Sequence, residues 1–296
     1  MSMDVLVTAL LDLAHELPDL PKPLLVGGGF GLYLKQRHLE EKEDLDTLIA
    51  GELWPPARAT EDVDLLLPTE VIISVEHMRA IRAALDTLGY RPDVPNFQFV
   101  KDTKRGPVKI DLLTGDVPDE HADKVHVKPP RVRPVGDVAL HAYLAREAIE
   151  LGLAPFEFTL RGVRSDDTPA GLTVRIPNSF TYLLMKLHAF RDRVDDERKD
   201  LGAHHALDVY RIIAMLNREE YDLVKRLAED HAASDAVRDA RAIVSNSFGS
   251  SSSVGVLRLL AGAEDAGLSR SAVQVDEFVS VLSELFPITK SEVSQR

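Results

Sequence analysis

The chain has 296 residues, of which 45% are hydrophobic and 28% charged, and it contains no cysteine. This composition is that of an ordinary globular protein, and the missing cysteine excludes disulfides, thiolate metal sites and cysteine nucleophiles. The formal net charge of −13 argues against avid, non-specific binding of nucleic acid over the whole surface, because such binding depends on Lys and Arg.

The first predicted element is an amphipathic helix from Val5 to Leu17, with apolar residues at helical spacing. The segment from Met1 to Leu20 has no basic leader, and acidic residues interrupt its apolar ones, so it resembles neither a signal peptide nor a membrane span. With the absence of cysteine, this predicts a cytoplasmic protein without membrane association.

A glycine cluster follows the first predicted strand. Pro23–Val26 is expected to be that strand, Gly27–Gly31 a tight turn, and the residues from Leu32 to Leu39 a helix. Such a turn lets backbone N–H groups approach an anion, and the N-terminus of the helix favours negative charge. Taken alone, the cluster is a weak signal and is more often a turn that binds no ligand, since glycine-rich turns are common.

Two carboxylates, Asp62 and Asp64, stand at the start of a hydrophobic strand that continues through Leu65–Leu67. Side chains two residues apart on a strand share a face, so both carboxylates point the same way. This geometry can hold a divalent cation. An isolated pair of this kind is more often a solvated strand edge, so other parts of the chain must decide between the two interpretations.

A third carboxylate, Asp111, lies in a later apolar strand. The chain from 71 to 88 is predicted as a helix, and strands are expected at 97–100 and 108–113, the second of which contains Asp111. If that strand lies beside the strand with the paired aspartates, three carboxylates converge and can bind two Mg²⁺ ions through oxygen ligands.

The chain then changes character near Pro177. A helix is expected at 139–151 and strands at 156–163 and 172–176, after which the pattern is almost continuously helical. The predicted helices of this last part are 180–190, 201–216, 221–232, 235–244, 254–261 and 273–285.

These elements predict an α/β (α+β) fold with two domains. Residues 1–177 would form a mixed-sheet domain, and residues 178–296 a helical domain. The serine-rich segment 246–253 is expected to be a flexible joint within the helical domain.

Four separated motifs occur in one order along the chain. They are Gly28-Gly29-Phe30-Gly31, then Arg58-x-Thr60-x-Asp62-Val63-Asp64, then Lys186 followed by Arg191 and Arg193, and finally Lys199-Asp200 with Asp208 downstream. In this order they resemble the nucleotidyltransferase superfamily with the polymerase-beta-like core. They resemble more closely its AbiEii-type toxin branch, which includes mycobacterial toxins that modify tRNA. The resemblance covers about the first three quarters of the chain.

The resemblance implies an N-terminal nucleotidyltransferase core and a Mg²⁺-dependent transfer of a nucleotidyl group from an NTP to an acceptor. It assigns metal binding, through two Mg²⁺ ions, to Asp62, Asp64 and Asp111, of which Asp111 could be a ligand or a base. The catalytic set is completed by Lys186 and Asp208.

Nucleotide binding is implied for a second group of residues. The resemblance places the phosphates of the NTP against Gly28, Gly29, Thr60, Lys186 and Arg191. Asp208 would orient Lys186 or the acceptor, and Asp200 is the alternative for that role. His204, His205 and Asp208 could also form a metal site, although adjacent histidines at a helix start are more often solvated.

The implied acceptor is first a tRNA 3′ end, in a toxin of a toxin–antitoxin or abortive-infection system whose partner would be a cognate antitoxin protein. A weakly basic segment from Lys101 to Arg133 is the candidate to guide RNA. The alternatives are NMPylation of a protein, nucleotidylation of a small molecule, and a non-catalytic scaffold that only binds a partner.

Overall fold

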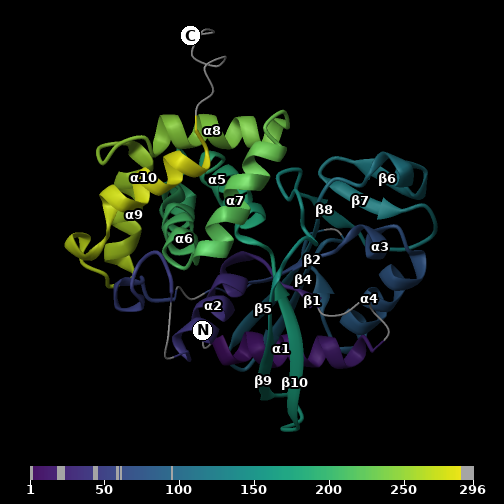
Figure 1. The fold of residues 1–296 in the computed structure, drawn as a ribbon. Helices are drawn as coiled ribbons and strands as arrows, with labels where there is room; N and C mark the ends of the chain where they lie inside the picture. Colours follow the sequence, from purple (N-terminus) through teal and green to yellow (C-terminus); the bar gives the residue numbers. More distant parts are fainter. Residues whose placement is uncertain are drawn as a thin grey trace. The chain divides into compact units, whose positions relative to one another are not determined.

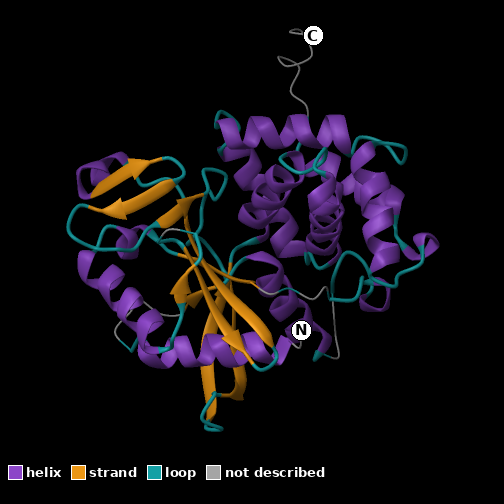
Figure 2. Ribbon diagram, turned by 180° about the vertical axis from the view of Figure 1, so that it is seen from behind, coloured by secondary structure: helices purple, strands orange, loops and turns teal. Residues whose placement is uncertain are grey.

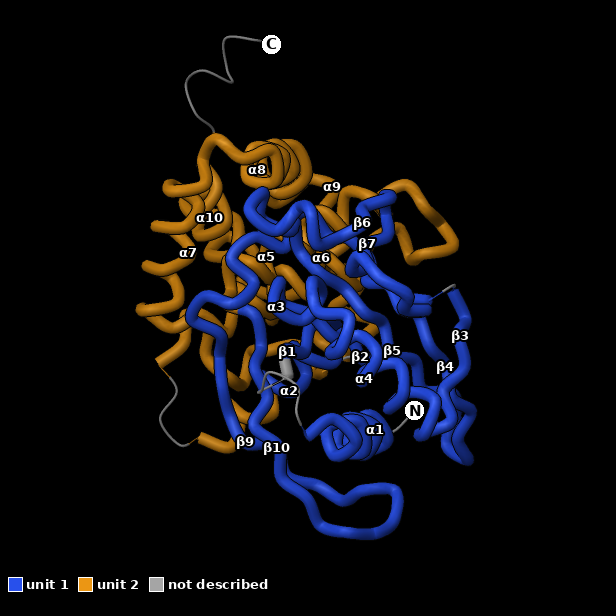
Figure 3. Tube along the Cα trace, turned by 90° about the vertical axis from the view of Figure 1, so that its right-hand side faces the viewer, with its two compact units in different colours: residues 1–35, 59–177 blue, residues 36–58, 178–296 orange. Residues whose placement is uncertain are grey.

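A computed structural model describes residues 3–18, 24–42, 46–57, 60, 62–94 and 96–287 (Figure 1). The chain combines mixed sheets with helices, in agreement with the predicted α+β class. It divides into two compact units, coloured separately in Figure 3. Unit 1 comprises Met1–Lys35 and Ala59–Pro177, and unit 2 comprises Gln36–Arg58 and Asn178–Arg296.

Residues 36–58 belong to unit 2, whereas the predicted first domain, 1–177, included them. The backbone N–H groups of Leu48 and Ile49 donate to the carbonyls of Leu216 and Ala214, at 2.8 and 3.2 Å. These contacts join parts of the chain more than 160 residues apart, so no local pattern indicates them.

Unit 1 contains a seven-stranded mixed sheet of order β3-β4-β5-β8-β7-β6, in which β2 also pairs with β5. Its strands are β2 (Asp62–Leu66), β3 (Arg91–Pro92), β4 (Gln98–Thr103), β5 (Gly106–Thr114), β6 (Val125–Lys128), β7 (Arg131–Pro134) and β8 (Ala142–Leu144). Along β5, the buried residues Val108, Ile110 and Leu112 alternate with less buried ones. The strand therefore has a core face and a polar face.

A second, three-stranded sheet has the order β1-β10-β9. Its strands are β1 (Leu24–Leu25), β9 (Phe156–Val163) and β10 (Pro169–Ile176), of which β9 and β10 form the long hairpin in Figure 1. Helix α1 (Met3–Glu16) packs on this hairpin. A Cβ at Gly162 would lie 2.9 Å from Leu11 and Val7 of α1, so the absence of a side chain allows this approach.

The remaining helices of unit 1 lie between its strands in the sequence. They are the start of α2 (Gly28–Glu40), α3 (Thr69–Ile72), α4 (Val75–Thr87) and the 3-10 turn η2 (Asp119–Lys124). The single helix predicted at 71–88 is two helices, because the chain turns at Ile73 and Ser74. The side chain of Ser74 caps α4 by accepting a hydrogen bond from the backbone of His77, at 3.2 Å.

The helix predicted at 139–151 is wrong, because this segment contains strand β8, which pairs with β5 and β7. Leu140, Ala142 and Leu144 are buried and alternate with the less buried His141 and Tyr143. The apolar residues thus follow a period of two, and their pairing within the sheet overrides the helical preference of the surrounding residues. The short ribbon of β6 and β7 was not predicted either.

Unit 2 is helical in its described part (Figure 2). Helix α6 lies against α5, α9 and α10, and its residues are almost all buried. The elements are η1 (Gly51–Leu53), α5 (Ser179–Arg191), η3 (Glu197–Gly202), α6 (Ala203–Ala214), α7 (Arg218–Asp230), α8 (Asp235–Ser247), α9 (Val254–Asp265), η4 (Arg270–Ala272) and α10 (Val275–Leu285).

The segment expected as a flexible joint, 246–253, ends α8 and forms a hydrogen-bonded turn. The backbone N–H of Ser250 donates to Ser253 Oγ at 3.0 Å. Phe248 is fully buried, with its ring centroid 4.9 Å from that of Phe190 and 5.9 Å from that of Phe278. This turn therefore packs into the core of unit 2. Across the described residues, no helix has the length and apolar character needed to cross a bilayer.

Candidate functional site

The glycine turn lies directly against Asp64 in unit 1. Gly27 donates its backbone N–H to the backbone carbonyl of Asp64 at 2.8 Å, and α2 begins at the next residue. Gly28 has a φ of +61°, and a Cβ there would lie 1.5 Å from Asp64 Oδ2. The position therefore requires glycine both for its backbone conformation and for space. The start of α2, which also contains Gly29, faces a carboxylate of the central strand.

Strand pairing brings the three predicted carboxylates to one face of the sheet. β2 and β5 run parallel, with Asp64 opposite Asp111 and Asp62 opposite Lys109. Residues that pair across neighbouring strands share a face, so the two aspartates of β2 lie on the same face as Asp111. The condition that the sequence left open, that these two strands are neighbours, is met.

Only one of the two carboxylate oxygens of Asp111 accepts a hydrogen bond from a described residue. β4 places Gln98 opposite Asp111, and Gln98 Nε2 donates to Asp111 Oδ2 at 3.0 Å. The other oxygen, Oδ1, is buried and has no hydrogen-bond partner among the described residues. A buried oxygen of this kind carries a desolvation cost that a donor or a cation would relieve.

The environment of Asp111 makes its carboxyl group a weaker acid. Burial, as the largest cause, raises the pKa of Asp111 to about 6, and the negative charges of Asp62 and Asp93 act in the same direction. The hydrogen bond from Gln98 and the charge of Lys109 oppose this rise in pKa. The negative charge of Asp62 therefore acts on Asp111 across the pair of strands β2 and β5.

Thr60 lies just before this group. Its Oγ1 accepts a hydrogen bond from the backbone N–H of Asp62 at 3.3 Å, which ties the start of β2. Unit 1 thus gathers Thr60, Asp62, Asp64, Asp111 and Gly28, while Arg58 of the same motif lies outside the described residues. This polar group is the candidate site of unit 1.

The donor set of this site suits Mg²⁺ in its chemistry, although it is not a ready-made cage. In the described parts of the chain, no three acidic or histidine side chains are close enough together to hold a metal ion. Mg²⁺ does not require such a group, because it keeps several waters and binds through one or two carboxylates together with substrate phosphates. The buried Oδ1 of Asp111 and its raised pKa are consistent with a cation at this face.

Lys186 and Asp208 form a separate centre within unit 2. Lys186 Nζ lies 2.6 Å from Asp208 Oδ2, and both side chains are buried. Asp200, the alternative partner, instead contacts the ring of His204, with 2.7 Å between Nδ1 and the carboxylate. Asp208 is therefore the aspartate that contacts Lys186.

Arg191 is on the surface at the end of α5. It donates to Asp192 and Asp239, at 3.0 and 2.8 Å, and its side chain is 44% exposed. Two surface carboxylates therefore already contact this guanidinium, and the structure supplies no further support for the predicted phosphate contact.

Two residues near Lys186 and Asp208, Arg211 and Gln36, were not predicted as functional, whereas His205 was named above as a possible metal ligand. Arg211 and Gln36 are buried next to Asp208, and His205 lies about one helical turn before Asp208 on α6. Burial, followed by the charges of Lys186 and His204, lowers the pKa of His205 to about 2. Arg211 follows Asp208 by three residues, which places it on the same helix face, and this spacing could have indicated it.

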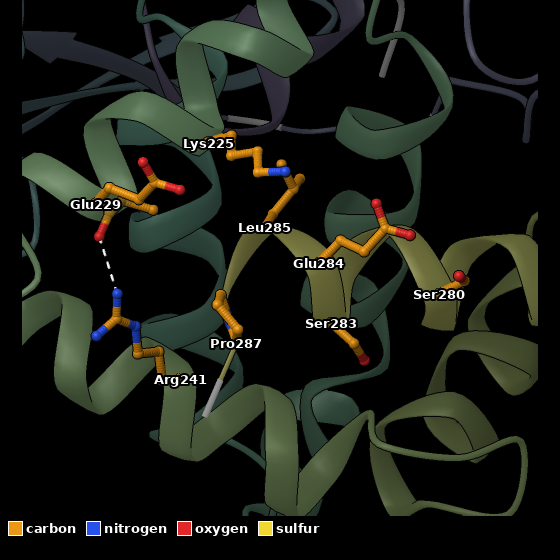
Figure 4. Close-up of a pocket in the computed structure, with 9 residues that line it drawn as sticks. Lys225, Glu229, Arg241, Ser280, Ser283, Glu284, Leu285 and Pro287 are labelled. Atoms are coloured by element: carbon orange, nitrogen blue, oxygen red, sulfur yellow. Dashed lines mark hydrogen bonds between the residues drawn. The ribbon is translucent and has the colours of Figure 1, made fainter. Parts of the chain in front are cut away.

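A hollow of about 540 Å³ in unit 2 lies apart from these residues (Figure 4). It is formed by α7, α8 and α10, and the buried Arg241 on its wall donates to the backbone carbonyl of Ala228 at 3.1 Å. The residues that line it are Lys225, Ala228, Glu229, Arg241, Ser280, Ser283, Glu284, Leu285 and Pro287. This set contains none of the predicted site residues.

No protein-family model matches the chain, and the curated proteins contain no significant match.

Proposed function

We propose that the chain is a Mg²⁺-dependent nucleotidyltransferase that transfers a nucleotidyl group from an NTP to an acceptor hydroxyl. The observation that carries this proposal is the contact of the Gly28 turn with Asp64, in a strand pair that sets Asp64 opposite Asp111. A glycine turn at a helix start suits phosphates, and coupled carboxylates beside it suit a divalent cation. The two features together favour a nucleotide with its metal over either ligand alone.

The reaction joins the acceptor oxygen to the α-phosphorus of the NTP and breaks the bond from that phosphorus to the oxygen of the leaving pyrophosphate. Asp62 and Asp64 supply carboxylate oxygens, and the turn at Gly28 and Gly29 offers backbone N–H groups to the phosphates. Bound Mg²⁺ would supply charge neutralisation for the triphosphate and a lower pKa for the attacking hydroxyl.

Asp111 is suited to take the proton of the acceptor hydroxyl. A base acts best when its pKa lies near the working pH, and the pKa of Asp111 is raised to about 6. Gln98 donates to Oδ2 of Asp111, and Oδ1 has no hydrogen-bond partner among the described residues. Lys186, by the resemblance, would contact the leaving pyrophosphate, and Asp208 would orient Lys186.

The proposed acceptor is a tRNA 3′ end, and the proposed role is that of a toxin in a toxin–antitoxin or abortive-infection system. This part of the proposal rests on the resemblance in sequence. Protein and small-molecule acceptors are the alternatives, and digestion of the labelled product with RNase or protease distinguishes them.

The test is the transfer of label from each NTP in the presence of Mg²⁺. We expect Asp62→Ala and Asp64→Ala to abolish transfer while the thermal unfolding of the protein stays cooperative, because these variants remove carboxylate oxygens at the site. Asp102→Asn is the matched control, since Asp102 is an exposed aspartate on β4 of the same sheet that pairs with Arg91.

Full transfer by either alanine variant would overturn the proposed role of the paired aspartates. A wild-type protein that neither transfers label nor gains thermal stability from any NTP with Mg²⁺ would instead favour the non-catalytic scaffold. A ligand at about 100 times its Kd should add ~2.7 kcal/mol of stability, which a thermal shift detects readily.

A further inference from the structure

A buried cluster surrounds Asp208 in unit 2. Asp208 is 0% exposed and Arg211 is 1% exposed, while Lys186 is 7% exposed. Lys186 and Arg211 engage different oxygens of the same carboxylate. Lys186 Nζ lies 2.6 Å from Oδ2, and Arg211 Nη1 lies 3.3 Å from Oδ1. Asp208 is thus shared between two cations that come from different helices, α5 and α6.

Gln36 fixes the other end of Arg211. Arg211 Nε and Nη2 both donate to Gln36 Oε1, at 3.1 and 2.6 Å. The amide nitrogen of Gln36 donates to the carbonyl of Pro55 at 3.1 Å and to Glu40 Oε1 at 2.8 Å. These two contacts determine which way the amide points. The guanidinium of Arg211 is therefore held in one orientation between Gln36 and Asp208.

We propose that Arg211, held by Gln36, is a positioning residue for Lys186. By taking Asp208 Oδ1, Arg211 fixes the plane of the carboxylate and hence the place at which Lys186 Nζ meets Oδ2. It also draws part of the negative charge of Asp208, so Lys186 is less completely neutralised by its partner and retains attraction for an anion. The inference rests on the proposed function in one respect, that the anion at Lys186 is a chain of phosphates.

The charges around Lys186 are compatible with an anion bound at its ammonium group. His205 is neutral, since its pKa is lowered to about 2, and it adds no charge of its own. The positive charges of Lys186 and Arg193 both lower this pKa, so both lie within electrostatic reach of the ring. Lys186 is more exposed than Asp208, Arg211 and Gln36, so of these four it is the residue that a ligand can contact.

The experiment measures binding of inorganic tripolyphosphate, without metal or nucleotide, by calorimetry on the full chain. We expect the wild type to bind and Lys186→Met to lose binding. Arg211→Met should weaken binding by about tenfold or more, since a hydrogen bond to a charged group is lost. Arg211→Lys should recover part of the loss, because it keeps the charge but cannot span both Asp208 and Gln36.

Two further variants separate positioning from simple loss of stability. Arg241→Met removes a comparably buried arginine, 4% exposed, from the same unit, and it should leave tripolyphosphate binding unchanged at a temperature where both proteins are folded. Gln36→Met conserves volume and removes the acceptor for Arg211, so it should weaken binding in the same direction as Arg211→Met. It provides the test if Arg211→Met does not fold.

Unchanged binding in folded Arg211→Lys and Gln36→Met would overturn the inference, as would a wild type that does not bind tripolyphosphate. Equal losses in Arg241→Met and Arg211→Met would also overturn it, because the effect would then follow from stability alone. The protein could fail to transfer a nucleotidyl group and still bind tripolyphosphate in a way that depends on Arg211. That result would count against the proposed function and leave the positioning role of Arg211 intact.

Discussion

Gly28 meets two requirements that experiment can separate. A Cβ at this position would lie 1.5 Å from Asp64 Oδ2, and the backbone has a positive φ. Gly89 also has a positive φ, +79°, but no atom lies within 4 Å of a Cβ there. We expect Gly28→Ala and Gly89→Ala each to lose about 1 kcal/mol of stability from backbone strain.

Only Gly28→Ala should also lose the thermal shift caused by an NTP with Mg²⁺, because only that variant displaces Asp64. Denaturant unfolding and thermal shift measure the two effects separately. Retention of the shift in Gly28→Ala would mean that the contact with Asp64 does not matter for ligand binding.

His205 makes stability depend on pH. Burial lowers its pKa from 6.5 to about 2 in the folded protein, whereas the unfolded chain takes up the proton near 6.5. The stability that neutral His205 contributes is therefore fully present above about pH 6.5 and declines as the pH falls below that value. Between pH 7 and pH 5 the loss amounts to about 2 kcal/mol.

Replacement of His205 tests this origin of the pH dependence. Both ring nitrogens of His205 are buried and have no hydrogen-bond partner among the described residues, so His205→Leu loses no hydrogen bond. We expect this variant to lose about 2 kcal/mol less stability than the wild type between pH 7 and pH 5 in urea unfolding. The comparison with the wild type is needed because the raised pKa of Asp111, about 6, stabilises the folded state over the same range in both proteins. His126→Gln, at an exposed position on β6, should keep the wild-type profile. A wild-type profile in His205→Leu would contradict the assignment.

At the scale of elements, strand β5 joins the parts of the large sheet. It pairs with β4, β2 and β8, and Leu112 also donates its backbone N–H to Phe97 at 2.9 Å. We expect the amides of β5 to exchange with deuterium far more slowly than those of the edge strands β3 and β6, because exchange requires the paired hydrogen bonds to open.

The same measurement examines β8, where the predicted helix was wrong. Protection is expected within residues 141–145, because the amides of His141 and Ala145 also donate to the carbonyls of Asn96 and Thr114, and faster exchange is expected from 146 to 151. Continuous protection from 139 to 151 would instead indicate a helix. Long alternating or helical patterns, such as those of β5 and α1, were predictable because many residues repeat the signal. β8 has three residues, too few for a pattern to outweigh local preference.

At the scale of the whole molecule, a net charge of −13 limits how RNA can bind. Any RNA affinity must come from a local group of cations, for which Lys128 and Arg131 on the exposed β6–β7 ribbon are candidates. We expect binding of tRNA to be weak and to fall steeply with added salt, because each phosphate contact releases counterions.

The acceptor is identified by incubating the protein with labelled NTP and total cell lysate. If tRNA is the acceptor, RNase removes the transferred label and protease leaves it. Label that protease removes would favour the protein acceptor. Label that resists both treatments and remains in the small-molecule fraction would favour the third alternative. Asp64→Ala serves as the control for label that the protein does not transfer.

The sequence by itself determined the features that neighbouring residues encode. The period of two in Asp62-Val63-Asp64 places both carboxylates on one face, the helical spacing predicts the helical half, and the absence of cysteine excludes thiol chemistry. Only the tertiary structure decided that Asp111 lies opposite Asp64, that Gly28 contacts this aspartate, and that Asp208 contacts Lys186. These contacts join residues that are distant in the chain, and their formation depends on strand pairing and core packing, which local preference does not specify.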